Sequence, residues 1–302
     1  MIDLRRLRVL RAVAYHGTVT AAAHALYMTP SAASQQIRAL GRDLGVTLLE
    51  PHGRRVRLTA AGRSLLAHAD TITEQWQHAE ADLAAANASM PAGELRLCGI
   101  TTAISALLAP VGERLRRQWP SVTVQIREAE PPECFDLLFA EVVDLVVTMA
   151  TPDGPPATDT RFSQQPLLDD PYDLLTAPDH PLAGRTGTTL ADLTAEPWIL
   201  GMPGTSYRRT ILALTNTAGF TPTIGHEVLE WTAVATLAGH GLGIALLPRL
   251  ARLPAEPPVV RTPLSDAPSR RLLTFIRRGS RDRPALAAAL GTLDEVAAGL
   301  DQ

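Results

Sequence analysis

A long stretch without proline divides this chain of 302 residues into two unequal parts. Thr59 can cap a helix that runs from Ala60 to about Ser89, and the next proline is Pro91. Apolar side chains repeat along this helix at alternating steps of four and three, as in a coiled coil: Leu65, Ala69, Ile72, Trp76, Ala79, Leu83 and Ala86. We therefore predict that this seam pairs with a second copy of the chain, with packing on the chain's own body as the alternative.

The electric charge is divided at the same place. Residues 1–65 contain ten arginines and three acidic residues, a net charge of +7, so the overall charge of −3 leaves −10 for the remainder. A basic head on an acidic body is expected where a module that binds a polyanion is joined to a domain that does not.

Several classes of protein are disfavoured by composition and motifs. The sequence has no apolar run long enough for a membrane span and no export signal at its N-terminus, so we expect a cytoplasmic protein without a membrane partner. The eight histidines form no metal-binding or catalytic motif, and no nucleophile motif or phosphate loop is present. Cys98 and Cys134 lack the spacing of a zinc site, and we interpret them as buried thiols. We expect no enzyme activity, no catalytic residues, no cofactor and no metal.

Three short helices are predicted ahead of the long one. The first has leucines at helical spacing, and Gly17 is its expected stop. Thr18 or Thr20 can cap the second helix, and Thr29 can cap the third, with Pro30 at its first position.

The third helix is predicted to have two distinct faces. The apolar face consists of Ala33, Ile37, Leu40 and Leu44. The opposite face consists of Ser31, Ser34, Gln35, Arg38 and Arg42. Hydroxyl, amide and guanidinium groups without an acidic residue suit a helix that lies in the major groove of DNA, although a solvated surface helix would have a similar pattern.

A hairpin is predicted to follow the third helix. Residues 46–50 and 54–59 have the composition of two short strands, and the turn between them contains Gly53. The arginines at its tip could lie along the DNA backbone or reach the minor groove, where the negative potential is concentrated.

The head resembles the winged helix-turn-helix of LysR-type transcriptional regulators. The segments that carry this resemblance are GTVTAAAHAL, SQQIRALGRDLGVTLLE and RVRLTAAG. By this resemblance the base-reading positions are Pro30, Ser31, Ser34 and Gln35, with Arg54 in the wing, and phosphate contacts are expected from Thr18, Thr20, Thr29 and Arg38. Members of the family usually carry Gln-Pro where this chain has Pro30-Ser31. The family's glutamine at that position, which could pair with adenine, is therefore absent from this chain.

The remainder of the chain has strands that alternate with helices, which predicts an α/β fold with a mainly parallel sheet. The expected strands are 95–99, 122–127, 143–149, 172–176, 198–200, 223–228, 243–247 and 271–276, and the expected helices are 107–118, 133–140, 207–218, 231–238 and 284–300. The segments AEPWIL, AGFTP and GHGLGIALLP resemble the regulatory domain of the same family, which is similar to a type 2 periplasmic binding protein.

The predicted domain organisation follows from these patterns and the resemblance. A winged helix-turn-helix occupies residues 1–59, a dimerisation helix 60–90, and a regulatory domain 91–302. Lobe I of that domain comprises about 91–165 and 269–302, and lobe II about 166–268.

A ligand is expected between the two lobes. Ligands of α/β sheets bind beyond the carboxyl ends of strands, where helix N-termini attract anions, and two such places are Thr101-Thr102 and Thr205-Ser206. Ordinary helix capping by these residues is the alternative. Alignment with the family places Ile100 where a serine or threonine usually contacts the effector. Trp231 could supply an aromatic wall or could be a core residue.

The sequence therefore predicts a transcriptional regulator of the LysR type. By the resemblance, a dimer or tetramer binds an interrupted inverted repeat in double-stranded DNA, contacts RNA polymerase, responds to a small anionic effector and is associated with the nucleoid. An architectural DNA-binding protein would not need a two-lobed body, and a stand-alone binding protein would not need the basic head. A regulator that has lost its effector remains an alternative.

Overall fold

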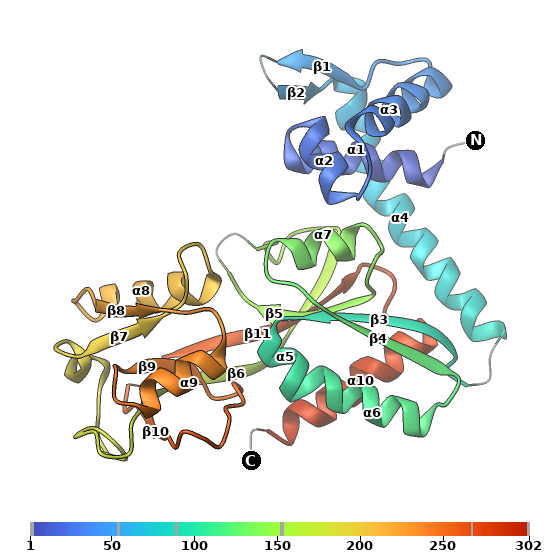
Figure 1. Ribbon diagram of the computed structural model, residues 1–302. Coiled ribbons are helices and arrows are strands. Elements are labelled where there is room, and N and C mark those ends of the chain that lie inside the picture. The colour runs from blue at the N-terminus through green and yellow to red at the C-terminus, as the bar shows by residue number, and fades with distance from the viewer. Residues whose placement is uncertain (1–2, 53–54, 88–89, 152–153, 267, 301–302) are drawn as a thin grey trace.

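The computed structural model describes the chain except for residues 1–2, 53–54, 88–89, 152–153, 267 and 301–302. Figure 1 shows a small head, a long helix that leaves it, and a larger body composed of two lobes. The head contains α1 (Leu4–His16), α2 (Val19–Ala25), α3 (Pro30–Leu44) and the antiparallel hairpin of β1 (Leu49–His52) and β2 (Arg55–Leu58).

The helix boundaries in the head follow the predicted caps. Thr18 Oγ1 accepts a hydrogen bond of 3.1 Å from the backbone N–H of Ala21, so Thr18 rather than Thr20 caps α2. Thr29 caps α3 in the same way, and Pro30 occupies the first helical position. Gly17 ends α1 in the left-handed region at φ +72°, a conformation that costs little only for glycine.

Two details of the predicted head are wrong. Leu44 belongs to the predicted apolar face of α3 but is 37% exposed, because it is the last residue of the helix. The first strand of the hairpin begins at Leu49 rather than at residue 46. The preceding residues form a loop that closes onto α3, since the backbone N–H of Val46 donates to the Gly41 carbonyl at 2.9 Å.

The long helix α4 (Ala60–Asn87) is capped by Thr59, whose Oγ1 accepts a hydrogen bond of 3.0 Å from the N–H of Gly62. One side of α4 packs on the chain's own body, and Gln77 there is 3% exposed. The other side carries seam residues with large exposed fractions, namely Ile72 at 36%, Trp76 at 48% and Leu83 at 61%. Part of the predicted apolar seam is therefore uncovered in a single chain.

The body is built on a seven-stranded sheet with the order β10-β6-β11-β5-β3-β4, in which β9 also pairs with β6. Its strands are β3 (Gly93–Gly99), β4 (Val122–Glu128), β5 (Leu145–Met149), β6 (Phe162–Thr176), β9 (Ala245–Pro248), β10 (Val260–Pro263) and β11 (Ser269–Arg277). The helices of lobe I are α5 (Thr101–Ala103), a π-helical turn (Ile104–Leu108), α6 (Ala109–Gln118), α7 (Glu133–Phe139) and α10 (Pro284–Ala298). Lobe II adds a 3₁₀ turn (Leu190–Leu193), β7 (Pro197–Leu200), α8 (Ser206–Thr217), β8 (Thr223–Glu227) and α9 (Trp231–Gly239).

The expectation of a mainly parallel sheet is wrong. β3 is parallel to β4 and β5, but β11 is antiparallel to β5 and β6, and β6 is antiparallel to β9 and β10. The reason is that β6 crosses from lobe I into lobe II and β11 returns beside it, so the two crossings form an antiparallel pair (Figure 1).

Two elements of the body extend further than predicted. Helical structure starts at Thr101, directly after β3, and runs through the π-helical turn to Gln118, whereas the sequence predicted a helix only from residue 107. The first part of this helix is buried on several sides, so its sequence does not show the alternation of apolar and polar residues that identifies a surface helix. The predicted strand 172–176 is the second half of β6, whose first half contains Pro166 beside an irregularity in the pairing with β11.

Candidate nucleic-acid interface and ligand cleft

The polar face of α3 is presented to solvent in the head. The opposite face is buried, with Ala33 at 0% and Ile37 at 6% exposure. Pro30, Ser31, Gln35 and Arg38 are exposed, and Ser34 is half-buried. Within the described part of the chain, these polar side chains make no ion pair with the protein. The groups predicted to read bases thus lie together on one accessible face of a single helix.

The predicted phosphate contacts lie at the ends of helices around this face. Thr18 and Thr29 use their hydroxyl oxygens as caps, so their hydroxyl hydrogens remain able to donate. Thr20 is exposed on α2. Arg54 lies outside the described residues. In the wing itself, Arg57 Nη2 pairs with Glu50 Oε1 at 2.6 Å, so this arginine is already engaged.

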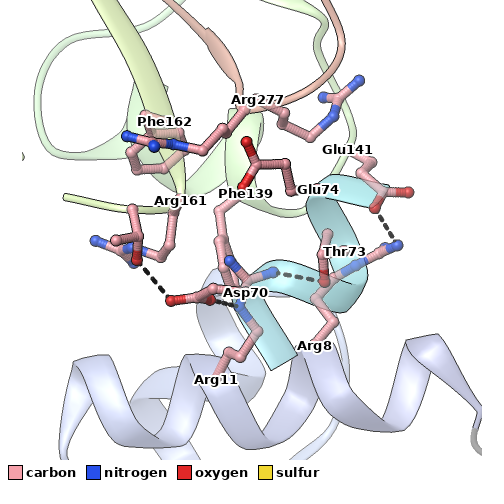
Figure 2. A pocket seen from close by; sticks show the side chains of 12 residues that line it. Arg8, Arg11, Asp70, Thr73, Glu74, Phe139, Glu141, Arg161, Phe162 and Arg277 are labelled. Atoms are coloured by element: carbon pink, nitrogen blue, oxygen red, sulfur yellow. Dashed lines mark hydrogen bonds and ion pairs between the residues drawn. The ribbon is translucent and has the colours of Figure 1, made fainter. Parts of the chain in front are cut away.

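A buried arginine joins the head, the long helix and the body (Figure 2). Arg11 of α1 places its Nε 2.7 Å from Asp70 Oδ1 of α4, and its Nη1 donates to Thr73 Oγ1 at 3.2 Å. Its guanidinium carbon lies 5.0 Å from the centroid of the Phe139 ring at the end of α7. Burial lowers the pKa of Arg11, against the opposing effect of the Asp70 charge.

Polar side-chain contacts also connect the head directly to the body. Arg8 pairs with Glu141, as Figure 2 shows, and His16 Nε2 lies 3.3 Å from Asp136 Oδ1. Burial raises the pKa of Asp136, although the neighbouring His16 opposes the shift. The space lined by Arg8, Arg11 and Glu141 is about 20 Å³, room for about one water molecule, so this contact region is a structural joint and not a site for a small molecule.

A cleft of about 380 Å³ lies between the two lobes of the body. Thr101 and Thr102 line it from lobe I, and Thr205, Ser206 and Trp231 line it from lobe II. The structure therefore brings together all five residues that the sequence predicted for effector binding. The volume falls in the range of small-molecule sites, roughly 300–1,000 Å³.

The hydroxyl groups of the two threonines on lobe I are engaged by other residues. Thr101 Oγ1 donates a hydrogen bond of 2.6 Å to Glu128 Oε1 at the end of β4. Thr102 Oγ1 accepts a hydrogen bond of 2.7 Å from Nη2 of Arg270 on β11. Neither caps the helix: the cap position belongs to Ile100, which makes no side-chain cap hydrogen bond.

On lobe II, one of the residues predicted to bind the effector, Thr205, acts as an ordinary helix cap. Thr205 Oγ1 accepts from the backbone N–H of Arg208 at 3.3 Å and caps α8. Trp231 is the first residue of α9 and is half-buried, and its ring packs edge-to-face on that of Tyr207 at 4.9 Å and 84°. Trp231 thus forms part of the cleft wall instead of lying fully in the core.

Sequence reasoning missed the charged residues of the cleft. Glu128, Glu130 and Glu230 line it together with Arg270. Glu128 is the last residue of β4 and Glu130 follows shortly after it. Acidic residues at the carboxyl end of a parallel strand were a signal that could have identified them. Carboxylates therefore outnumber cations among the lining residues of the cleft, whereas the sequence predicted an anionic effector.

The part of the chain that the structure describes has no group of three or more histidine, cysteine or acidic side chains arranged to hold a metal ion. Cys98 and Cys134 are both buried and unpaired, as predicted. Burial raises the pKa of Cys98 to about 12, which keeps its thiol protonated and unreactive at neutral pH. No helix among the described residues has the length and apolar character of a membrane span.

Comparisons with known proteins define the class. The family described as "Bacterial regulatory helix-turn-helix protein, lysR family" matches residues 4–63, and the "LysR substrate binding domain" matches residues 88–298. The chain belongs to the LysR family of bacterial transcriptional regulators.

Individual relatives cover nearly the whole chain. The HTH-type transcriptional regulator YnfL of Escherichia coli is 34% identical over 82% of both chains, and the RuBisCO operon transcriptional regulator of Allochromatium vinosum is 27% identical over 95% of this chain and 94% of its own. Among solved structures, an OxyR cysteine mutant from Corynebacterium glutamicum has a TM-score of 0.61 at 25% identity and covers 99% of this chain and 93% of that one. Full-length CbnR complexed with its target DNA has a TM-score of 0.55 at 25% identity, and the match covers 98% of this chain and 100% of the CbnR chain.

Proposed function

We propose that the protein is a ligand-responsive transcriptional regulator, not an enzyme, that binds an interrupted inverted repeat in double-stranded DNA as a dimer or tetramer. In this proposal residues 1–59 read DNA, 60–90 pair two chains, and 91–302 bind the effector and contact RNA polymerase at the nucleoid. The observation that carries the proposal is the exposed polar face of α3 within a basic segment, residues 1–65, that has a net charge of +7. The occurrence of a DNA complex among the structural relatives supports it.

The division of labour on α3 follows from side-chain chemistry. Gln35 can make a bidentate contact with adenine in the major groove, and Ser31 and Ser34 can donate to or accept from base edges. The guanidinium of Arg38 suits phosphate, and neutralisation of phosphate makes binding dependent on salt. We therefore assign sequence preference to Gln35 and general DNA affinity to Arg38.

Dimerisation through α4 is supported by the exposed seam. Ile72, Trp76 and Leu83 are large apolar side chains that a second copy of α4 would cover. Two heads related by a twofold axis would then require a target sequence of matching pseudo-symmetry.

Footprinting of the full-length protein on the DNA upstream of its own gene tests the proposal. We expect protection of an inverted repeat, and a ligand of the cleft should change its extent by altering the spacing of the two heads. The proposal is wrong if purified protein protects no specific sequence even at low salt.

A further inference from the structure

The cation that lines the cleft is neutralised by a neighbouring carboxylate. Arg270 Nε and Nη2 donate to Asp170 Oδ2 at 2.9 and 2.7 Å, and the two side chains are 8% and 0% exposed. Arg270 also donates to Thr102 Oγ1. The charge of Arg270 is therefore balanced from within the protein. Arg209 lies nearby, where its Nη1 donates to the Gly204 carbonyl at 2.9 Å and its Nη2 lies 3.5 Å from Ser206 Oγ.

Carboxylates of the chain itself occupy the two places where an anion was expected. At the start of α5, Glu128 accepts the hydroxyl hydrogen of Thr101. At the start of α8, Glu130 lines the cleft together with Ser206. Burial raises the pKa of Glu130, while Ser206 and the charges of Arg270 and Arg209 oppose that shift. The partial positive charge of each helix N-terminus is therefore partly balanced from within the protein.

The rest of the lining is aromatic and apolar. Trp231 lies in the wall beside Tyr207, while Ile100, Met149 and Leu229 add aliphatic surface. An indole ring attracts cations through its quadrupole, more strongly than the other aromatic side chains. Carboxylates on one side and an aromatic ring on the other form a suitable environment for an ammonium group attached to an apolar body.

We propose that the cleft binds a small organic ammonium compound with an apolar body, whose N–H groups donate to Glu130 and Glu128 while the body packs against Trp231. This inference rests on the proposed function, since it names the class of effector. A carboxylate of the same size would instead meet the three glutamates, including Glu230 at the start of α9.

The test compares ligands of equal size and opposite charge on the full-length protein. The pairs are phenethylamine with 3-phenylpropionate and 1,5-diaminopentane with glutarate, and isothermal titration calorimetry measures each affinity. We expect at least one amine to bind ten times more tightly than its carboxylate partner. Tighter binding of the carboxylates, or no binding of either amine, would overturn the proposal.

Variants locate the binding and separate the inference from the proposed function. Glu130→Gln should weaken amine binding at least tenfold, and Trp231→Leu should weaken it severalfold. Glu113→Gln is the matched control, because Glu113 is exposed on α6 and does not line the cleft. Equal amine affinity in Glu130→Gln and wild type would refute the assignment. Footprints of each variant without ligand report DNA binding separately, so a wrong ligand class leaves the protected repeat in place, whereas a wrong function removes it.

Discussion

Asp144 connects three arginines in the body and offers a quantitative test of the packing. Its side chain is 0% exposed, Arg96 and Arg277 pair with it at 3.1 and 2.8 Å, and Arg283 donates to Oδ1 at 3.0 Å. Burial alone would raise its pKa, but hydrogen bonding to Arg96 and the charge of Arg277 outweigh that effect and lower the pKa from 3.8 to about 2.

The expected effect of Asp144→Asn follows from this shift. Folding lowers the pKa of Asp144 by almost two, and at 1.36 kcal/mol per unit of pKa this corresponds to about 2 kcal/mol of stability. The variant also leaves Arg277, which is 8% exposed, without its countercharge, and an uncompensated buried charge costs about 3–5 kcal/mol. We therefore expect the free energy of unfolding to fall by about 2–5 kcal/mol at neutral pH.

Urea denaturation followed by circular dichroism measures this loss. Asp169→Asn is the control, because Asp169 pairs with Arg271 on the surface and both are more than half exposed, so its removal should cost much less than the removal of Asp144. Because the folded pKa of Asp144 is lowered, its contribution is present above pH ~4 and is lost as the pH falls toward 2, so the difference between wild type and variant should shrink over that range. A loss in Asp144→Asn no larger than that of the control would refute the reasoning.

Three further predictions concern the head, the linker helix and the body segment that contacts the linker helix. Gln35→Ala should reduce discrimination at one base pair by about 1–3 kcal/mol, while Arg38→Ala should weaken binding to all sequences and reduce the salt dependence, both measured by fluorescence anisotropy at several salt concentrations. Leu83→Glu should shift the protein toward the monomer in analytical ultracentrifugation, whereas Ala85→Glu, outside the seam, should not. Gly279→Ala should lower the free energy of unfolding by more than about 1 kcal/mol in thermal denaturation, because φ is +84° and the added Cβ would lie 2.5 Å from the Glu74 carbonyl oxygen. The control is Gly291→Ala in α10, where an added Cβ meets nothing within 4 Å. A similar loss of stability in this control would contradict the explanation.

The parts of the fold that the sequence predicts well are those determined by local interactions. Caps such as Thr18 and Thr29 act within a few residues of themselves, and glycines such as Gly17 end helices through their own backbone conformation. The direction of strands depends on pairing between distant segments. The 15-residue strand β6 was only partly recognised because Pro166 and Pro171 interrupt its pattern, although they are accommodated in the sheet.

The sequence predicted which uncharged residues line the cleft but not its charged residues. Thr101 and Ser206 lie on opposite walls of the cleft because helices start at the carboxyl ends of strands, a rule that needs no knowledge of contacts. Whether their hydroxyls are available to a ligand depends on where Glu128 and Glu130 lie, and that is set by the folding of the segment after β4 against lobe II. Spacing in the sequence alone does not contain this information.

A single strand links the cleft to the linker helix. Arg270 at the start of β11 lines the cleft, and Arg277 at its end donates to Gln77 Oε1 of α4 at 3.3 Å. Between them β11 pairs with both β5 and β6, which makes it a stiff element rather than a flexible connection. Because β6 and β11 are also the two crossings between the lobes, a ligand that changes lobe closure acts on the same strand that contacts α4. In the proposed regulator, a change in the cleft would therefore reach the linker helix through one continuous element.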